Sequence, residues 1–260
     1  MIDASVVTRW KPRRVRQPGL VELGACERLR VLAREVPAGE AIVELGAYQG
    51  RATGWLLLGA QEGQGAHVTT VDPWTLYKPR PDTPADLTAL YGRPEAYASF
   101  KAHMAEIGAG REQLTVKRGY AANIGAKWTG PRVGLLWHDA EHSADAVAAD
   151  LEAWLPHLSE TAVVVLHDAG NPAYGVVEGA LRVLGDGGWQ FEDADGRLHD
   201  VPQVIRWRKN PKRRGLLVAR RRPTEDAAAP ERVEQRDESE AGESQQVNET
   251  NSLDATEGGE

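Results

Sequence analysis

The chain has 260 residues, 41% of them hydrophobic, which is enough to build a substantial core in one large or two small domains. Its single cysteine, Cys26, excludes an internal disulfide and a cysteine-rich zinc site, and fits a reducing cytoplasm. No stretch approaches 18 uninterrupted apolar residues, and the N-terminus lacks the apolar run of a signal peptide. We therefore expect a cytoplasmic protein without a membrane span.

The net charge of −7 is unevenly distributed along the chain. Residues 224–260 carry 12 acidic and 2 basic side chains, a net of −10, which leaves the rest at +3. This segment has no aromatic residue, so it cannot bury enough apolar surface to offset the entropy lost on ordering. We predict a disordered acidic tail at 223–260, preceded by an N-terminal basic arm and helix at 1–38 and by one domain at 39–222.

The N-terminal segment begins with a basic cluster at residues 9–16, which we interpret as a solvated arm. Leucine and valine then recur at helical spacing, which predicts a helix over residues 20–36. Pro37 and Gly39 would end this helix.

Residues 41–53, AIVELGAYQGRAT, have the pattern of a strand, a glycine turn and a helix. The strand at 41–45 is apolar, as a buried parallel strand is, and the turn is bounded by Gly46 and Gly50. A ligand fits such a turn, because the N-terminus of the following helix offers free N–H groups. The spacing matches neither G-x-G-x-x-G nor a P-loop. The pattern present is E-x-G-x-x-x-G. Its acid, Glu44, stands at the end of the strand and suits a ligand with positive charge. The alternative is an ordinary strand-to-helix turn.

A second strand, residues 67–71, ends at Asp72. An acid in this position can accept both hydroxyls of a ribose, although a plain turn aspartate before Pro73 is the alternative. Trp74 follows, and could either pack on an adenine or be buried in the core. The connection at 75–98 is rich in proline and tyrosine, and a segment of this length is usually functional, so we interpret it as a substrate-side insertion or lid.

Helices and strands alternate through the rest of the domain. Residues 100–107 are predicted to be helical, 113–117 to form a third strand and 118–121 the turn after it. Further helices are predicted at 144–158 and 176–184, and further strands at 133–137, 161–166, 203–207 and 215–219. The last two could form a hairpin with a basic, solvated turn.

This order predicts an α/β fold, with a Rossmann-like, doubly wound, mostly parallel sheet and a C-terminal antiparallel hairpin. Polar clusters follow strands one, two, four and five. They should therefore gather at the carboxyl edge of the sheet, where such folds bind ligands.

The sequence Asp139-Ala140-Glu141-His142-Ser143 follows the fourth strand, and the fifth strand ends in His167-Asp168. These elements resemble one branch of the class I S-adenosylmethionine (SAM)-dependent methyltransferases, which has D-G-D-H-S and an acidic pair at these places. The E-x-G-x-x-x-G pattern and the run V-D-P-W at 71–74 are similar to this family as well. The likeness covers about residues 40–220, and the branch includes O-methyltransferases acting on sugar or phenolic hydroxyls.

The resemblance implies a SAM site along the first three strands, in the domain at 39–222. The methionine end of SAM would meet Glu44, Gly46 and Gly50. Asp72 would hold the ribose, and Trp74 and Gly119 would lie near the adenine.

The resemblance also implies a catalytic centre after strands four and five. Asp139 matches a family acid that binds a divalent metal or orients the acceptor. A divalent metal would lie among Asp139, His167 and Asp168, although His167 replaces the usual acid and imidazole shifts the preference away from magnesium. We expect His142 to act as general base or to orient the acceptor, assisted by Asp139, with His138 or His167 as substitutes. Alternatively, His142 caps the helix or contacts the cofactor.

We therefore predict a SAM-dependent methyltransferase, with O-methylation of a small hydroxylated molecule as its reaction. One alternative is a catalytically silent SAM- or nucleotide-binding scaffold protein. Another is a nucleic-acid-associated methyltransferase, which basic clusters at 9–16 and 206–214 favour. The acidic tail opposes it, as does the lack of an Asn-Pro-Pro-aromatic element after strand four, so nucleic acid is not the expected partner. The sequence indicates neither the acceptor nor the oligomeric state.

Overall fold

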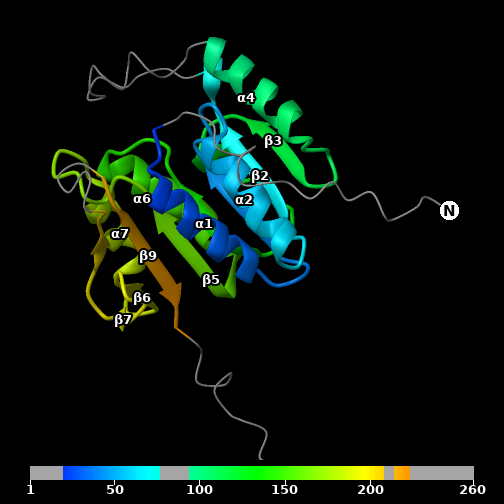
Figure 1. The fold of residues 1–260 in the computed structure, drawn as a ribbon. Coiled ribbons are helices and arrows are strands. Elements are labelled where there is room, and N and C mark those ends of the chain that lie inside the picture. Colours follow the sequence, from blue (N-terminus) through cyan, green and yellow to red (C-terminus); the bar gives the residue numbers. More distant parts are fainter. Residues whose placement is uncertain (1–19, 77–93, 208–213, 223–260) are drawn as a thin grey trace, which may run out of the picture. The chain divides into compact units, whose positions relative to one another are not determined.

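The structure, a computed structural model, describes residues 20–76, 94–207 and 214–222 (Figure 1). These residues fall within one compact unit, Met1–Thr224. The predicted basic arm, the acidic tail and most of the predicted insertion lie outside the described residues. None of the described helices is both long and apolar enough to cross a membrane.

Nine strands of the described chain form one sheet, in the order β3-β2-β1-β4-β5-β9-β6-β7, with β8 paired to β9. The first five strands are parallel to one another, as predicted: β1 (Ala41–Leu45), β2 (His67–Asp72), β3 (Leu114–Arg118), β4 (Val133–His138) and β5 (Leu158–Leu166). The C-terminal strands are antiparallel to their partners: β6 (Trp189–Glu192), β7 (Leu198–His199), β8 (Val204–Ile205) and β9 (Leu216–Arg221).

The predicted C-terminal hairpin is confirmed, because β8 pairs antiparallel with β9 and Val204 lies opposite Leu217. The position of β9 in the sheet was not predicted. This strand lies between β5 and β6, so that the last described strand is inside the sheet and not at its edge. Strands β6 and β7 were not predicted, because they are only four and two residues long.

Helices cover both faces of the sheet (Figure 1). On one face lie α1 (Leu23–Glu35), α2 (Arg51–Glu62) and α4 (Pro94–Ile107), and on the other lie α5 (Ala121–Gly125), α6 (Ala144–Trp154) and α7 (Val176–Leu184). Neighbouring strand residues alternate between the two cores, since successive side chains point to opposite faces. In β1, Ile42 packs in the core under α1 and α2, and Val43 packs in the core under α6.

Two helix boundaries differ from the prediction for local reasons. Helix α4 begins at Pro94, six residues earlier than predicted, and proline is favoured in the first turn of a helix because its missing N–H needs no partner there. Helix α6 ends at Trp154, and the segment Leu155–His157, which contains Pro156, forms a short 3₁₀ helix.

The polar segments after the strands meet at the carboxyl edge of the sheet, as predicted. Hydrogen bonds between backbone groups join them in sequence across the sheet. Gly46 N donates to Val71 O (2.8 Å), Asp139 N donates to Leu45 O (2.8 Å), and His167 N donates to His138 O (3.0 Å). The loops after β1, β2, β4 and β5 are therefore held side by side.

Candidate active site

The glycine turn after β1 touches the loop after β4. Gly46 has φ +89°, and a Cβ added to it would lie 2.1 Å from the carbonyl oxygen of Asp139. Only glycine fits both this backbone conformation and this close approach. Gly50, with φ +86°, caps the start of α2, and its N–H donates to Ala47 O at 2.7 Å. Both predicted glycines thus shape the turn, and Gly46 also sets its distance from Asp139.

Glu44 is fully buried beneath this turn. The hydroxyl of Thr53 donates to its Oε2 at 2.6 Å, and its Oε1 has no hydrogen-bond partner among the described residues. Burial raises the pKa of Glu44 to about 8; the Thr53 and Thr70 hydroxyls oppose this rise, and the nearby Asp139 and Asp72 add to it. With this pKa the carboxyl is mostly protonated at neutral pH, and an ammonium placed against it would favour its ionised form.

Asp72 uses both carboxylate oxygens to order the surrounding backbone. Its Oδ2 accepts from the N–H groups of Ala47 and Tyr48, each at 2.9 Å, and its Oδ1 accepts from Trp74 N at 2.6 Å. Burial raises the pKa of Asp72, and these three hydrogen bonds oppose the rise. Asp72 therefore stabilises the turn, as the alternative interpretation has it, and the ribose contact stays a prediction. A carboxylate oxygen can accept more than one hydrogen bond, so a contact with ribose is compatible with this role.

Trp74 is packed in the core and is only 2% exposed. Its ring centroid lies 4.8 Å from that of Tyr97 and 5.1 Å from that of Phe100, and its Nε1 donates to Tyr48 O at 2.8 Å. This is the burial alternative, and it leaves little of the ring surface for an adenine. Gly119 follows β3 and donates its N–H to Asp72 O at 3.1 Å, so it does lie beside the predicted ribose ligand.

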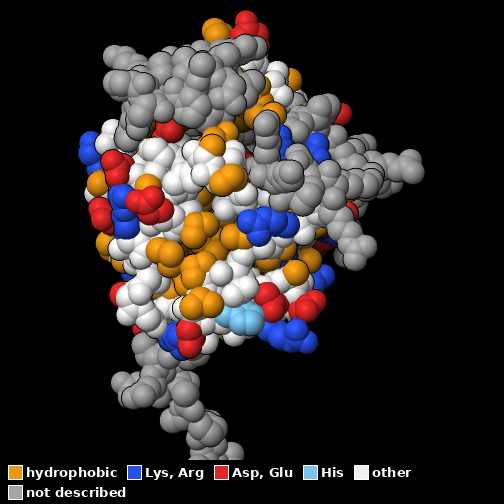
Figure 2. Space-filling model, turned by 90° about the vertical axis from the view of Figure 1, so that its left-hand side faces the viewer, with side chains coloured by type: hydrophobic (Ala, Val, Ile, Leu, Met, Phe, Trp, Pro, Cys, Tyr) orange, Lys and Arg blue, Asp and Glu red, His pale blue; other side chains and the backbone are white. Residues whose placement is uncertain are grey.

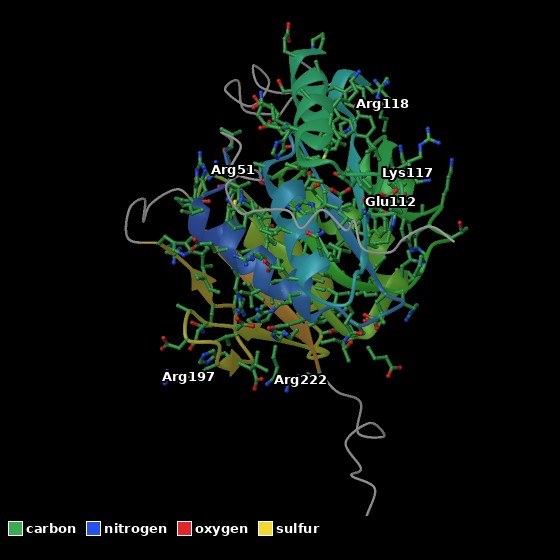
Figure 3. All side chains as sticks on the ribbon, turned by 45° about the vertical axis from the view of Figure 1, so that its right-hand side comes forward. Arg51, Glu112, Lys117, Arg118, Arg197 and Arg222 are labelled. Carbon is green, nitrogen blue, oxygen red and sulfur yellow. The ribbon has the colours of Figure 1, made fainter. Side chains whose placement is uncertain are left out.

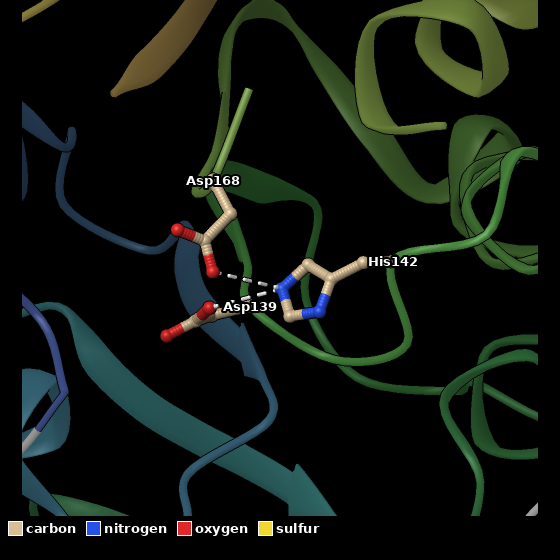
Figure 4. Close-up of side chains that lie close together, drawn as sticks. All are labelled: Asp139, His142 and Asp168. Carbon is tan, nitrogen blue, oxygen red and sulfur yellow. Dashed lines mark ion pairs between the residues drawn. The ribbon is translucent and has the colours of Figure 1, made fainter. Parts of the chain in front are cut away.

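Asp139, His142 and Asp168 converge where β4 and β5 end (Figure 4). His142 Nε2 lies 3.5 Å from Asp139 Oδ1 and 3.5 Å from Asp168 Oδ2. Neither ring nitrogen makes a hydrogen bond within the described residues. The ring stacks on Tyr174, with centroids 4.8 Å apart and planes inclined by 14°. One carboxylate oxygen from each aspartate thus faces Nε2 of the His142 ring, and Tyr174 packs against a face of this ring.

Asp139 and His142 lie together in the loop before α6. The cap of α6 is Ser143, whose hydroxyl accepts from Ala146 N at 3.4 Å. The alternative in which His142 caps the helix is therefore wrong in this structure. His138 lies apart from this centre, because its Nε2 interacts with Asp150 on α6 at 3.1 Å.

His167 is clamped between carboxylates through both ring nitrogens. Its Nδ1 lies 2.9 Å from Asp139 Oδ1, and its Nε2 lies 2.7 Å from Glu22 Oε2. Burial alone would lower the pKa of His167, but Asp139 and Glu22 outweigh burial and raise it to about 10. The ring is therefore an imidazolium, with both nitrogens occupied as donors.

The two aspartates respond differently to the same surroundings. Burial acts to raise the pKa of Asp139, but His167 and His142 outweigh it and hold this pKa well below its usual range. Burial also raises the pKa of Asp168, although His167 opposes the rise. Asp168 has φ +55°, a left-handed conformation that is uncommon for residues other than glycine. Such conformations are often found at functional sites.

A metal site in this region would use His142 and not His167. Asp139, His142 and Asp168 each offer a ligand atom, and these atoms lie within 4.8 Å of one another. The predicted set contained His167 in place of His142. The structure gives both nitrogens of His167 to Glu22 and Asp139, which leaves His142 as the imidazole that faces both aspartates. Two carboxylates and one imidazole are a plausible donor set for a divalent transition metal.

Two residues of this centre were missed by sequence reasoning. Glu22 begins the N-terminal helix, 145 positions before its partner His167, and no local spacing links them. Tyr174 lies in the loop between β5 and α7, where only the three-dimensional structure reveals its stacking on His142. Neither residue belongs to a motif, so no sequence signal could have found it.

The described basic side chains are spread over the molecule. In Figure 3, Lys117 and Arg118 project from β3, whereas Arg197 and Arg222 lie at the bottom of the picture, beside the C-terminal strands. On the face drawn in Figure 2, lysine and arginine side chains are interspersed with acidic and hydrophobic ones. Most of the two predicted basic clusters lies outside the described residues. The described surface in these views thus adds no support for a nucleic-acid partner.

The parallel strands in the order β3-β2-β1-β4-β5, with helices on both faces, form a Rossmann-like fold. Residues 43–169, from β1 to just past Asp168, match a family model described as a methyltransferase domain. None of the curated proteins compared with the chain matches it.

Solved structures are similar to the chain at low sequence identity. The O-methyltransferase TomG from Streptomyces achromogenes, in complex with SAM, is 18% identical with a TM-score of 0.54, and the match covers 78% of this chain and 81% of TomG. An O-methyltransferase from Bacillus cereus, in complex with SAH, is 12% identical with a TM-score of 0.57, and the match covers 83% of this chain and 94% of that protein. At these identities, the likenesses show that the chain shares its fold with these methyltransferases.

Proposed function

We propose that the protein is a SAM-dependent O-methyltransferase that acts on a small hydroxylated molecule. The observation that carries this proposal is the position of His142 Nε2, 3.5 Å from a carboxylate oxygen of Asp139 and of Asp168, at the edge of the sheet beside the Gly46 turn. The two solved O-methyltransferases similar to the chain, one bound to SAM and one to SAH, support the same reaction.

The charge of the region supports a cationic cosubstrate. Three carboxylates, from Glu22, Asp139 and Asp168, surround one imidazolium at His167, so negative charge is in excess. SAM carries an ammonium and a sulfonium, and a positive charge beside Glu44, which is buried beneath the glycine turn, would favour its ionised form. A dinucleotide brings a pyrophosphate, which these carboxylates would repel.

Methyl transfer to oxygen needs an aligned acceptor and a base for its proton. The acceptor oxygen attacks the methyl carbon in line with the carbon–sulfur bond, this bond breaks, and SAH leaves with the electron pair on sulfur. The hydroxyl proton passes to His142 Nε2, because imidazole is the side chain best suited to accept a proton near neutral pH. Asp139 and Asp168 then stabilise the imidazolium, and the stack on Tyr174 fixes the ring.

A divalent cation, where one binds, would be held by Asp139, His142 and Asp168 and would lower the pKa of the acceptor hydroxyl. His142 Nε2 cannot be a metal ligand and a base at the same moment. The two versions of the site therefore predict different responses to chelation. If turnover is unchanged after exhaustive chelation, the reaction needs no metal and His142 acts as the base.

The test compares His142→Ala with His199→Ala, a histidine paired with Asp193 in the β6–β7 region. Calorimetry should give the same SAM affinity for both variants and for the wild type, and stronger binding of SAM than of NAD. Over a panel of phenols and sugars, His142→Ala should slow turnover by ~10²-fold or more, with His199→Ala unaffected.

Three results would change the proposal. NAD binding without SAM binding refutes it. SAM binding with no turnover on any acceptor favours a silent scaffold. A weakened SAM affinity with an unchanged maximal rate for His142→Ala makes His142 a cofactor contact, and the base must then be sought at Asp139.

A further inference from the structure

The side chain of Glu22 has an unusual partner for a residue at the start of a helix. Glu22 is the N-cap of α1, a position whose side chain commonly accepts a hydrogen bond from the first turn. Here the side chain makes no such bond, and only the backbone carbonyl is used, by Cys26 N at 3.0 Å. The carboxylate instead points into the site and accepts from His167 Nε2 at 2.7 Å.

His167 links Glu22 to Asp139 at the centre of the site. The ring is only 2% exposed, and its other nitrogen donates to Asp139 Oδ1 at 2.9 Å. The ring is thereby fixed at both ends. The same oxygen of Asp139 is the one that faces His142 Nε2. Glu22, His167 and Asp139 therefore form one hydrogen-bonded chain, and its last oxygen lies 3.5 Å from His142 Nε2, the group proposed to accept the proton.

We propose that Glu22 is a positioning residue, which acts through His167 to hold the Asp139 carboxylate towards His142 and the acceptor. This inference rests on the proposed function, because it concerns the same site. It goes further in making the start of α1, which lies outside the segment matched to the methyltransferase domain, a part of the active site. A misplacement of about 1 Å at a reacting group can slow a reaction by ~10²-fold, so a lost hydrogen bond in this chain should be visible in turnover.

The alternative is a purely structural role, in which the hydrogen bond from His167 to Glu22 only connects α1 to the end of β5. The two roles differ in what a substitution changes. A structural link affects thermal stability and leaves turnover of the folded protein unchanged. A positioning role lowers kcat, with KM and SAM affinity nearly constant.

Three variants of the full chain separate these roles. Glu22→Ala removes the acceptor, Glu22→Gln keeps an acceptor oxygen without the charge, and Glu27→Gln makes the matched change at an exposed position of the same helix. We expect kcat to fall ~10²-fold for Glu22→Ala and ~10-fold for Glu22→Gln, with SAM affinity within about two-fold of wild type. Glu27→Gln should behave as wild type. Equal kcat for all three variants overturns the proposal.

A second measurement needs no turnover. Proton NMR of the wild type, with His167→Gln for assignment, should show two hydrogen-bonded imidazole N–H signals from His167. Glu22→Ala should lose the Nε2 signal and keep the Nδ1 signal, and Glu27→Gln should keep both. Absence of both signals in the wild type refutes the chain even if methyl transfer is found. If the signals behave as expected but no acceptor is turned over, the proposed function fails and the chain of contacts stands.

Discussion

The contact between Gly46 and the loop after β4 can be tested by adding a single methyl group, in Gly46→Ala. The new Cβ would lie 2.1 Å from Asp139 O, 2.6 Å from Asp139 C and 2.9 Å from Ala140 N. These are backbone atoms, which cannot rotate away as the end of a side chain can. The Asp139 loop must move by more than 1 Å before ordinary contact at about 3.4 Å is restored.

Two penalties combine in this variant. The left-handed conformation, with φ +89°, costs an alanine about 1–2 kcal/mol. Overpacking against a fixed neighbour typically costs a further ~1–3 kcal/mol. We expect Gly46→Ala to lower the free energy of unfolding by about 2–5 kcal/mol. Because Asp139 moves with its loop, turnover should fall as well.

Gly65→Ala is the matched control. Gly65 has φ +75°, but a Cβ there meets nothing within 4 Å, so this variant carries the conformational penalty alone. Urea unfolding at 25 °C should place Gly65→Ala about 1–2 kcal/mol below wild type and Gly46→Ala clearly lower. Calorimetry on the folded variants should show weaker SAM binding for Gly46→Ala only. If the two variants are equally stable and bind SAM equally well, the close approach of the two loops is refuted.

Three further predictions concern single features. The folded pKa of Glu44, about 8, lies above its ordinary 4.5, so the folded protein binds more protons between these pH values and its stability falls as the pH rises. A shift of one pKa unit corresponds to about 1.4 kcal/mol. Between pH 4 and pH 9, the free energy of unfolding of the wild type should therefore fall by up to ~5 kcal/mol relative to that of Glu44→Gln, as measured by urea unfolding. If the unfolding free energies of the two proteins change in parallel with pH, the raised pKa is contradicted. Trp74→Phe should lower the free energy of unfolding by more than ~1 kcal/mol, because it loses the hydrogen bond to Tyr48 O and the smaller ring leaves part of the core unfilled. A tenfold loss of SAM affinity at unchanged stability would instead favour adenine stacking. A chain ending at Pro223 should keep its thermal stability and SAM affinity, and a large loss of either would show that residues 224–260 contribute to the fold.

Local sequence patterns were sufficient to predict the central part of the fold. Four apolar residues in Ala41–Leu45, followed by Gly46, specify a buried strand and a turn, and the alternation with helices specifies a parallel sheet. The meeting of Asp139 and Asp168 follows from this topology, because neighbouring parallel strands end at one edge. His142 was within reach because it lies only three residues from Asp139 in the same loop.

Other features depend on contacts that no short segment encodes. Trp74 has the same residues around it in the sequence whether it stacks on a ligand or on Tyr97 and Phe100, and only the packing of α4 decides between them. His167 stands where the resemblance implies a metal ligand. Its role changes because Glu22, from a distant helix, occupies its second nitrogen.

The insertion of β9 between β5 and β6 has a consequence for biosynthesis. Strand β5 ends at Leu166 and β9 ends 55 residues later, at Arg221. At a translation rate of about 5–20 residues per second, roughly 3–11 s pass between the synthesis of the two strand ends. During this interval the A-V-V-V-L run of β5 has no partner on one side, and an unpaired apolar strand can pair with other chains. The β5 edge of a nascent chain is therefore open to pairing with other chains until Leu216–Arg221 has been made.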